Sequence, residues 1–122
     1  MMKRQRFNIT TDASGDATVQ NNPAVLGELC CILYIPGTIA TGATLTVTCE
    51  GDANKPLLTK ATAGTSNTWF YPRDLVHAVA DGAALTGTAG GDRTEPILNG
   101  RIKVVIASGG NAATGSVIVY YE

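Results

Sequence analysis

The segment Thr44–Cys49 alternates strictly between threonine and an apolar residue, with Leu45, Val47 and Cys49 on one side and three threonines on the other. Because successive side chains of a strand point to opposite faces of a sheet, this pattern predicts a strand with one buried face. The chain also holds sixteen threonines and fourteen glycines, a composition typical of strands joined by tight turns. The sequence therefore predicts a mainly β protein.

Other segments have the composition of short strands bounded by turn residues. In the segment 101–106 we expect Ile102, Val104 and Ile106 to face inward. The turn at 12–15 predicts a hairpin between the first two strands, and the glycine-rich segment 109–115 predicts a second hairpin between the last two. The further expected strands cover residues 4–11, 16–20, 28–35, 56–61, 65–71, 101–106 and 116–121.

One short helix is predicted over residues 72–80. Pro72 suits a first helical turn, and Leu75, Val76 and Val79 form a short apolar stripe behind the acid Asp74. Residues 81–94 are rich in glycine, alanine and threonine, which predicts a long surface loop.

About eight short strands at these spacings are typical of a sandwich. We therefore expect an all-β fold, a single antiparallel β-sandwich of jelly-roll type with one short helix, occupying residues 1–122 as one domain.

Charge and hydropathy exclude several classes of function. Nine basic residues against ten acidic ones give a net charge of −1, which offers no broad footprint for a nucleic acid. The longest apolar stretch, Leu29–Ile35, is far shorter than the ~20 residues of a membrane span. The basic start of the chain has no apolar region after it, so we expect no secretory signal and synthesis in a cytoplasm. Nucleic acid and membrane are thus not expected partners.

The three cysteines have no spacing used by metals or redox motifs. Cys30 and Cys31 are adjacent, so on a regular strand they point to opposite faces and do not serve one site. We interpret all three as small hydrophobic residues in strands, with a Cys31–Cys49 bridge between neighbouring strands as the alternative.

The search for catalytic chemistry finds no recognisable arrangement. His77 is the only histidine and lies in no known motif. Most acidic residues fall at turns or strand ends, and the glycines of 87–91 lack the lysine and hydroxyl residue of a phosphate loop. We therefore expect no enzymatic activity, no cofactor, no metal and no small-molecule substrate.

Two features suggest surfaces for a protein partner. Lys3, Arg4 and Arg6 place three positive charges within four residues. One interpretation is an arm that docks on an acidic surface, and the other is an edge strand that uses charge to prevent aggregation.

The second feature is the aromatic run Trp69-Phe70-Tyr71. Alternation places Trp69 and Tyr71 on the face opposite Phe70. Either Phe70 is in the core and the other two form a surface platform, or the reverse holds. A platform could bind a sugar ring or anchor a protein interface.

Turn and strand signatures recur in five segments, namely 9–18, 63–73, 78–82, 101–105 and 109–115. In these segments the chain resembles the small capsid cement, or decoration, proteins of tailed bacteriophages. The resemblance spans nearly the whole chain and rests on turn and strand signatures rather than chemical motifs.

The resemblance implies a viral structural protein with a jelly-roll fold and no enzymatic activity. Such proteins lie on the outer capsid surface of the virion and bridge major capsid subunits, so the expected partners are the major capsid protein and further copies of this chain, as a homodimer or another small oligomer. The residues we expect at the interface are Lys3, Arg4, Arg6, Phe7, Trp69, Tyr71 and Arg73. The alternative function is a carbohydrate-binding or adhesive β-sandwich module of a phage tail fibre, with Trp69 and Tyr71 as its platform.

Overall fold

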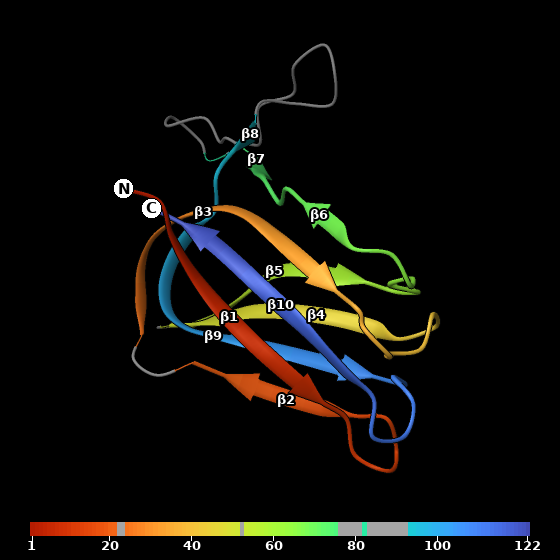
Figure 1. The fold of residues 1–122 in the computed structure, drawn as a ribbon. Coiled ribbons are helices and arrows are strands. Elements are labelled where there is room, and N and C mark those ends of the chain that lie inside the picture. The colour runs from red at the N-terminus through yellow and green to blue at the C-terminus, as the bar shows by residue number, and fades with distance from the viewer. Residues whose placement is uncertain (22–23, 52, 76–81, 83–92) are drawn as a thin grey trace.

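Ten strands make up the regular structure of the described residues (Figure 1). The computed structural model describes residues 1–21, 24–51, 53–75, 82 and 93–122. The strands are β1 (Lys3–Thr10), β2 (Ala17–Gln20), β3 (Val25–Ile35), β4 (Thr44–Glu50), β5 (Asn54–Lys60), β6 (Thr68–Phe70), β7 (Asp74–Leu75), β8 (Arg93–Thr94), β9 (Ile97–Ala107) and β10 (Thr114–Tyr121). Within the described residues the pairings are antiparallel and no helix occurs, which confirms the expected all-β antiparallel class.

Eight of the strands form one sheet, in the order β1-β10-β3-β9-β4-β5, with β2 added on β9 and β6 on β3. The two longest strands change partner along their length. Val25–Glu28 of β3 pairs with Ile97–Gly100 of β9, whereas the rest of β3 pairs with β10 and β6, and the rest of β9 pairs with β4 and β2. The sheet thus divides into group I (β1, β10, β3, β6) and group II (β2, β9, β4, β5), joined where β3 and β9 pair (Figure 1).

Both groups contribute side chains to one hydrophobic core. The predicted alternation of Thr44–Cys49 is confirmed, since Leu45, Val47 and Cys49 are buried and the threonines between them are only half-buried. The inward residues predicted in β9 are buried as well. The strand residues of the core include Phe7, Ile9, Val25, Leu29, Ile32, Tyr34, Leu45, Val47, Cys49, Leu57, Leu98, Ile102, Val104, Ile106, Val117 and Val119.

Both predicted hairpins are wrong, although the turns themselves form. The Asp12 carboxylate accepts hydrogen bonds from the backbone N–H groups of Ser14 and Asp16, at 2.9 and 3.0 Å. The chain leaves this turn into β2, which pairs with β9, while β1 pairs with β10. The strand β10 likewise pairs with β1 and β3 rather than with β9. A turn residue reverses the chain, but it does not decide whether the returning strand lies beside the first or in the other group.

The expected helix over residues 72–80 is not supported where the structure describes it. Asp74–Leu75 is an extended strand that pairs with Arg93–Thr94. The last two residues of the expected loop 81–94 are therefore a strand rather than part of a loop. Residues 76–80, with His77, and most of the loop lie outside the described residues. Over the part of the chain that is described, no helix is long and apolar enough to cross a membrane.

The two adjacent cysteines lie at a β-bulge, which corrects their predicted arrangement. Tyr120 and Tyr121 of β10 face Cys31 and Leu29 of β3, so Cys30 is an extra residue without an opposite neighbour. Such an insertion shifts the alternation of the strand by one residue. Leu29 before the bulge and Ile32 after it both face the core, and Cys30 and Cys31 between them do not belong to the core cluster.

Both cysteines consequently lie outside the core, Cys30 half-buried and Cys31 buried. All three cysteines of the chain are free. Cys49 lies in the core whereas Cys31 does not, so the alternative of a Cys31–Cys49 bridge is wrong.

We predict that Gly100→Ala destabilises the protein strongly. Gly100 has a φ of 147°, and a Cβ there would lie 2.1 Å from the backbone oxygen of Glu50. The added methyl group must push two strands apart at the point where β9 passes from β3 to β4. We expect a loss of about 2–3 kcal/mol in the free energy of unfolding, measured by chemical denaturation.

Gly42→Ala is the matched control, because a Cβ at Gly42 would meet nothing within 4 Å. It should change the free energy of unfolding by less than about 0.5 kcal/mol. Equal effects of the two substitutions would contradict the role assigned to Gly100.

We predict that Tyr34→Phe stabilises the protein. Tyr34 is 0% exposed, and among the described residues its hydroxyl has no hydrogen-bond partner. Burial also raises the pKa of the Tyr34 phenol, because removal from water disfavours its ionised form. Removing an unpaired buried hydroxyl should raise the free energy of unfolding by about 1 kcal/mol, measured by thermal and urea unfolding. A loss of similar size would show that the hydroxyl is hydrogen-bonded in solution.

Candidate functional site

The outer face of group I carries residues from all four of its strands. The register sets Arg6 opposite Ile118, Ile118 opposite Leu33, and Leu33 opposite Trp69, which gives one row across the group. A second row runs from Arg4 through Tyr120 to Cys31. We call these residues the outer patch: Arg4, Arg6, Cys31, Leu33, Trp69, Ile118 and Tyr120.

The outer patch has an apolar layer of its own. Ile118 is 4% exposed and Cys31 is 7% exposed, yet neither belongs to the core cluster. The rings of Trp69 and Tyr120 pack against each other, with centroids 5.4 Å apart and planes tilted by 36°. Trp69 nevertheless stays 48% exposed. The patch therefore combines a partly exposed aromatic pair with the apolar side chains of Cys31, Leu33 and Ile118, a composition typical of protein interfaces.

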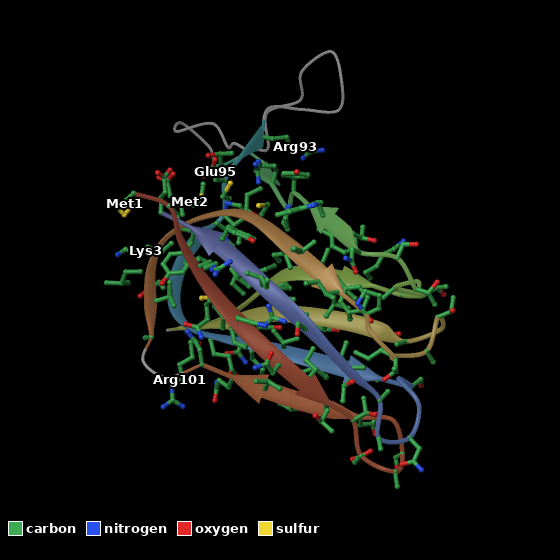
Figure 2. The ribbon with its side chains drawn as sticks, in the orientation of Figure 1. Met1, Met2, Lys3, Arg93, Glu95 and Arg101 are labelled. Carbon is green, nitrogen blue, oxygen red and sulfur yellow. The ribbon has the colours of Figure 1, made fainter. Side chains whose placement is uncertain are left out.

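Arg4 and Arg6 form the β1 edge of the outer patch. Both are exposed, and the Arg6 guanidinium donates hydrogen bonds of 3.0 Å to the side-chain oxygens of Asn8 and Ser116. These bonds hold the charge of Arg6 over the neighbouring strand β10. Lys3 lies at the start of β1 (Figure 2), opposite Tyr121 near the other terminus of the chain, which Figure 1 marks.

Phe7 is the expected interface residue that the structure places elsewhere. It is 2% exposed and belongs to the core, on the face of β1 opposite Arg4 and Arg6. Its side chain is therefore part of the folded interior, and the basic residues of β1 remain as surface candidates.

Of the two arrangements considered for the aromatic run, the structure has the one with Phe70 inward and with Trp69 and Tyr71 at the surface. Phe70 packs against the core while Trp69 and Tyr71 are exposed, Tyr71 by 61%. The Arg73 guanidinium donates hydrogen bonds to the backbone oxygens of Cys30 and Pro72, at 2.9 and 2.7 Å. Arg73 is thereby fixed beside the bulge and next to the outer patch.

Sequence reasoning missed the middle of the patch. The segment 117–120 is apolar at every position, so its two faces are both apolar. That pattern predicts a strand with a second covered face, and Ile118 and Tyr120 supply it here. The register that joins them to Arg4, Arg6 and Trp69 has no signal in the sequence.

A second surface feature is an open depression of about 610 Å³ near β7 and β8. Figure 2 shows Arg93 and Glu95 at this end of the molecule. Its lining residues are Glu28, Arg73, Asp74, Arg93, Thr94, Glu95 and Ile97. Asp74 is also paired with Lys55, at 2.5 Å between Nζ and Oδ2. The two signs of charge alternate around it, so it offers no single charge to a ligand. Among the described residues, no cluster of three or more histidine, cysteine and acidic side chains is placed to hold a metal ion.

Comparisons with known proteins identify no family. No family model matches the chain, and no curated protein matches it. Among solved structures, it is similar to part of the exo-β-1,3-galactanase from Phanerochaete chrysosporium, solved with galactose, at 15% identity and a TM-score of 0.35. The match covers 98% of this chain and 27% of the galactanase chain. A likeness at this level carries no argument about the fold or the function of this chain.

We predict that the stability of the protein falls as the pH rises from about 9 to about 11. Burial raises the pKa of the Cys31 thiol from 9.0 to about 11, aided by the adjacent Cys30 side chain and opposed by the Arg73 charge. Within this window the folded protein retains a proton that the unfolded chain releases, so the free energy of unfolding decreases with pH. Urea denaturation across the window measures the decrease, and Cys31→Val should make it less steep. Parallel curves for the two proteins would contradict the assignment.

Proposed function

We propose that this chain is a capsid cement, or decoration, protein of a tailed bacteriophage. In this proposal it is a single β-sandwich domain of jelly-roll type, lies on the outer surface of the virion head, and bridges major capsid subunits as a homodimer or another small oligomer. The resemblance of its turn and strand segments to such proteins motivates the proposal.

The observation that carries the proposal is the outer patch. An exposed tryptophan packed against a tyrosine, with apolar residues on the neighbouring strands and arginines at the edge, is a composition favoured in protein interfaces. Two segments expected at the interface from the sequence, the basic start and the aromatic run, contribute Arg4, Arg6 and Trp69 to this one face. The proposal therefore assigns the outer patch to contact with the major capsid protein.

The chemistry of the patch also restricts its counterpart. Arg4 and Arg6 favour a capsid surface that presents carboxylates around an apolar centre. The same charges disfavour the pairing of β1 with β1 of a second copy, because like charges would lie side by side along the new strand pair. Self-association is thus proposed to use another surface of the chain.

A modest interface is sufficient for a cement protein. Each copy that bridges two capsid subunits engages both at once, so the second contact forms at a high effective concentration. The rigidity of the sheet keeps the patch in a fixed orientation, which limits the entropy lost on docking.

We predict that Trp69→Ala weakens binding to capsids. Co-sedimentation of the purified protein with undecorated capsids, with bound copies counted per particle, should give a saturating number fixed by the lattice. Removing the tryptophan at the centre of an interface costs about 2 kcal/mol, roughly a 30-fold weaker affinity. The double substitution Arg4→Glu and Arg6→Glu should also weaken capsid binding, and the loss of affinity should be larger at low salt than at high salt.

Charge reversal is a sharper test than removal of residues 1–6, because residues 3–6 pair with β10 and their loss would disturb the sheet. Lys60→Glu is the control, since Lys60 is an exposed cation on β5 of group II. Absence of saturable binding by the unaltered protein, or equal loss with Lys60→Glu, would overturn the proposal.

The exposure of Trp69 and Tyr71 also favours a second candidate, a carbohydrate-binding or adhesive module of a tail fibre. A glycan screen distinguishes the two functions. A cement protein gives no signal in it, whereas an adhesive module binds a glycan and loses that binding with Trp69→Ala.

A further inference from the structure

Three polar side chains on the outer face of group I form a closed hydrogen-bond network. Asn8 lies opposite Ser116 in the pairing of β1 with β10, and Arg6 lies two residues before Asn8 on the same face of β1. The Arg6 guanidinium donates hydrogen bonds of 3.0 Å from Nε to Asn8 Oδ1 and from Nη2 to Ser116 Oγ. The Ser116 hydroxyl donates in turn to Asn8 Oδ1, at 3.3 Å. Ser116 is only 6% exposed, so the network is anchored in the sheet.

The network uses one edge of the guanidinium and leaves the opposite edge for a partner. A guanidinium carries five N–H donors in a rigid plane. The hydrogen bonds to Asn8 and Ser116 occupy the edge formed by Nε and Nη2, so the N–H groups of the edge formed by Nη1 and Nη2 point away from them. Two parallel N–H groups at the end of a guanidinium match the two oxygens of one carboxylate.

The charge of Arg6 has no counter-charge within the described residues. The lysines Lys55 and Lys103 are paired with Asp74 and Glu50, whereas no described carboxylate lies within ion-pair distance of the Arg6 guanidinium. The outer patch itself contains no acidic residue. An oriented cation beside an apolar surface is therefore left to pair with an anion from outside the chain.

Arg4 provides the comparison on the same strand. It lies two residues before Arg6 on the same exposed face, and among the described residues its side chain donates no hydrogen bond. The two arginines thus carry the same charge, but only the Arg6 guanidinium is held in one orientation. A side chain that is already held loses less conformational entropy when it binds.

We propose that Arg6 is the specificity-determining residue of the outer patch and binds one aspartate or glutamate carboxylate of the partner protein through two parallel hydrogen bonds. Asn8 and Ser116 are positioning residues, because they act through the Arg6 guanidinium. This inference rests on the proposed function, since it takes the major capsid protein as the partner.

The register of the outer patch also sets the spacing that the partner must match. Arg6 and Trp69 stand at the two ends of one row that crosses β1, β10, β3 and β6. Three strand spacings of about 4.8 Å place these two positions about 14 Å apart. The capsid protein is therefore expected to present a carboxylate and an apolar contact for the tryptophan at about this separation.

The first test compares Arg6→Lys with Arg4→Lys in co-sedimentation with undecorated capsids. A lysine keeps the charge but cannot form two parallel hydrogen bonds, so Arg6→Lys should weaken capsid affinity about tenfold and Arg4→Lys less than about twofold. The dependence of affinity on salt should be the same for both variants and the unaltered protein, because no charge is removed. If the arginines of β1 only protect a sheet edge, charge alone is sufficient and both variants bind as the unaltered protein does.

The second test removes a positioning residue. Asn8→Ala should weaken capsid affinity about threefold, because Arg6 loses one of the bonds that orient it, and it should cause no further loss in the Arg6→Lys background. Arg6 and Asn8 are both exposed, so these variants should keep the unfolding midpoint of the unaltered protein.

A third measurement needs no capsid. In the free protein, the heteronuclear NOE of the Arg6 Nε–H should be close to backbone values, whereas that of Arg4 should be much lower. Asn8→Ala should lower the Arg6 value toward that of Arg4.

The outcomes separate this inference from the proposed function. Equal mobility of the two arginines, an unchanged affinity of Arg6→Lys, or an additive loss from Asn8→Ala in the Arg6→Lys background overturns the inference and leaves the capsid-binding function intact. Absence of saturable binding by the unaltered protein instead overturns the proposed function, and this inference with it.

Discussion

The pairing of Val25–Glu28 with Ile97–Gly100 is the interaction on which the rest of the structure depends. Here the two longest strands pass from one group to the other, so this short ladder sets how the two groups lie around their shared core. Gly27 and Gly100 have φ values of 153° and 147°, and each is approached by a backbone oxygen where a Cβ would stand. The end of the chain is tied to the same place by hydrogen bonds between Glu28 and Glu122. Glycine is needed where strands bend sharply and backbones approach this closely.

The two groups differ in the side chains on the face turned away from the core. On β4 of group II, the outer positions are occupied by threonines, which are compatible with water. On group I, the corresponding positions of β10 and β3 are Ile118, Tyr120, Leu33 and Cys31, and Trp69 covers them only partly. A sheet that faced only solvent on this side would need none of these apolar side chains. The asymmetry is the physical reason to place a partner on group I.

Alternation in the sequence was sufficient to locate most of the strands and their inward residues. It succeeded at Thr44–Cys49 and at Ile102, Val104 and Ile106, because a strand with one covered face has a period of two. It failed for strand partners, since Asp12 and Gly15 define the same turn whether the chain continues beside β1 or crosses to β9. The candidate site shows the same division. Arg4, Arg6 and Trp69 could be singled out as unusual residues, but only the register shows that they share one face.

The bulge at Cys30 shows why a local irregularity can be invisible to pattern analysis and still be required. From Leu29 to Ile35 every residue is apolar, so the sequence has no polar positions that would mark a change of phase. The phase nevertheless changes, because Leu29 and Ile32 both face the core although two residues, rather than one, lie between them. If Cys30 instead followed the regular alternation of the strand, Ile32 and Tyr34 would turn outward and Cys31 and Leu33 inward. The bulge therefore keeps Ile32 and Tyr34, both fully buried, in the core.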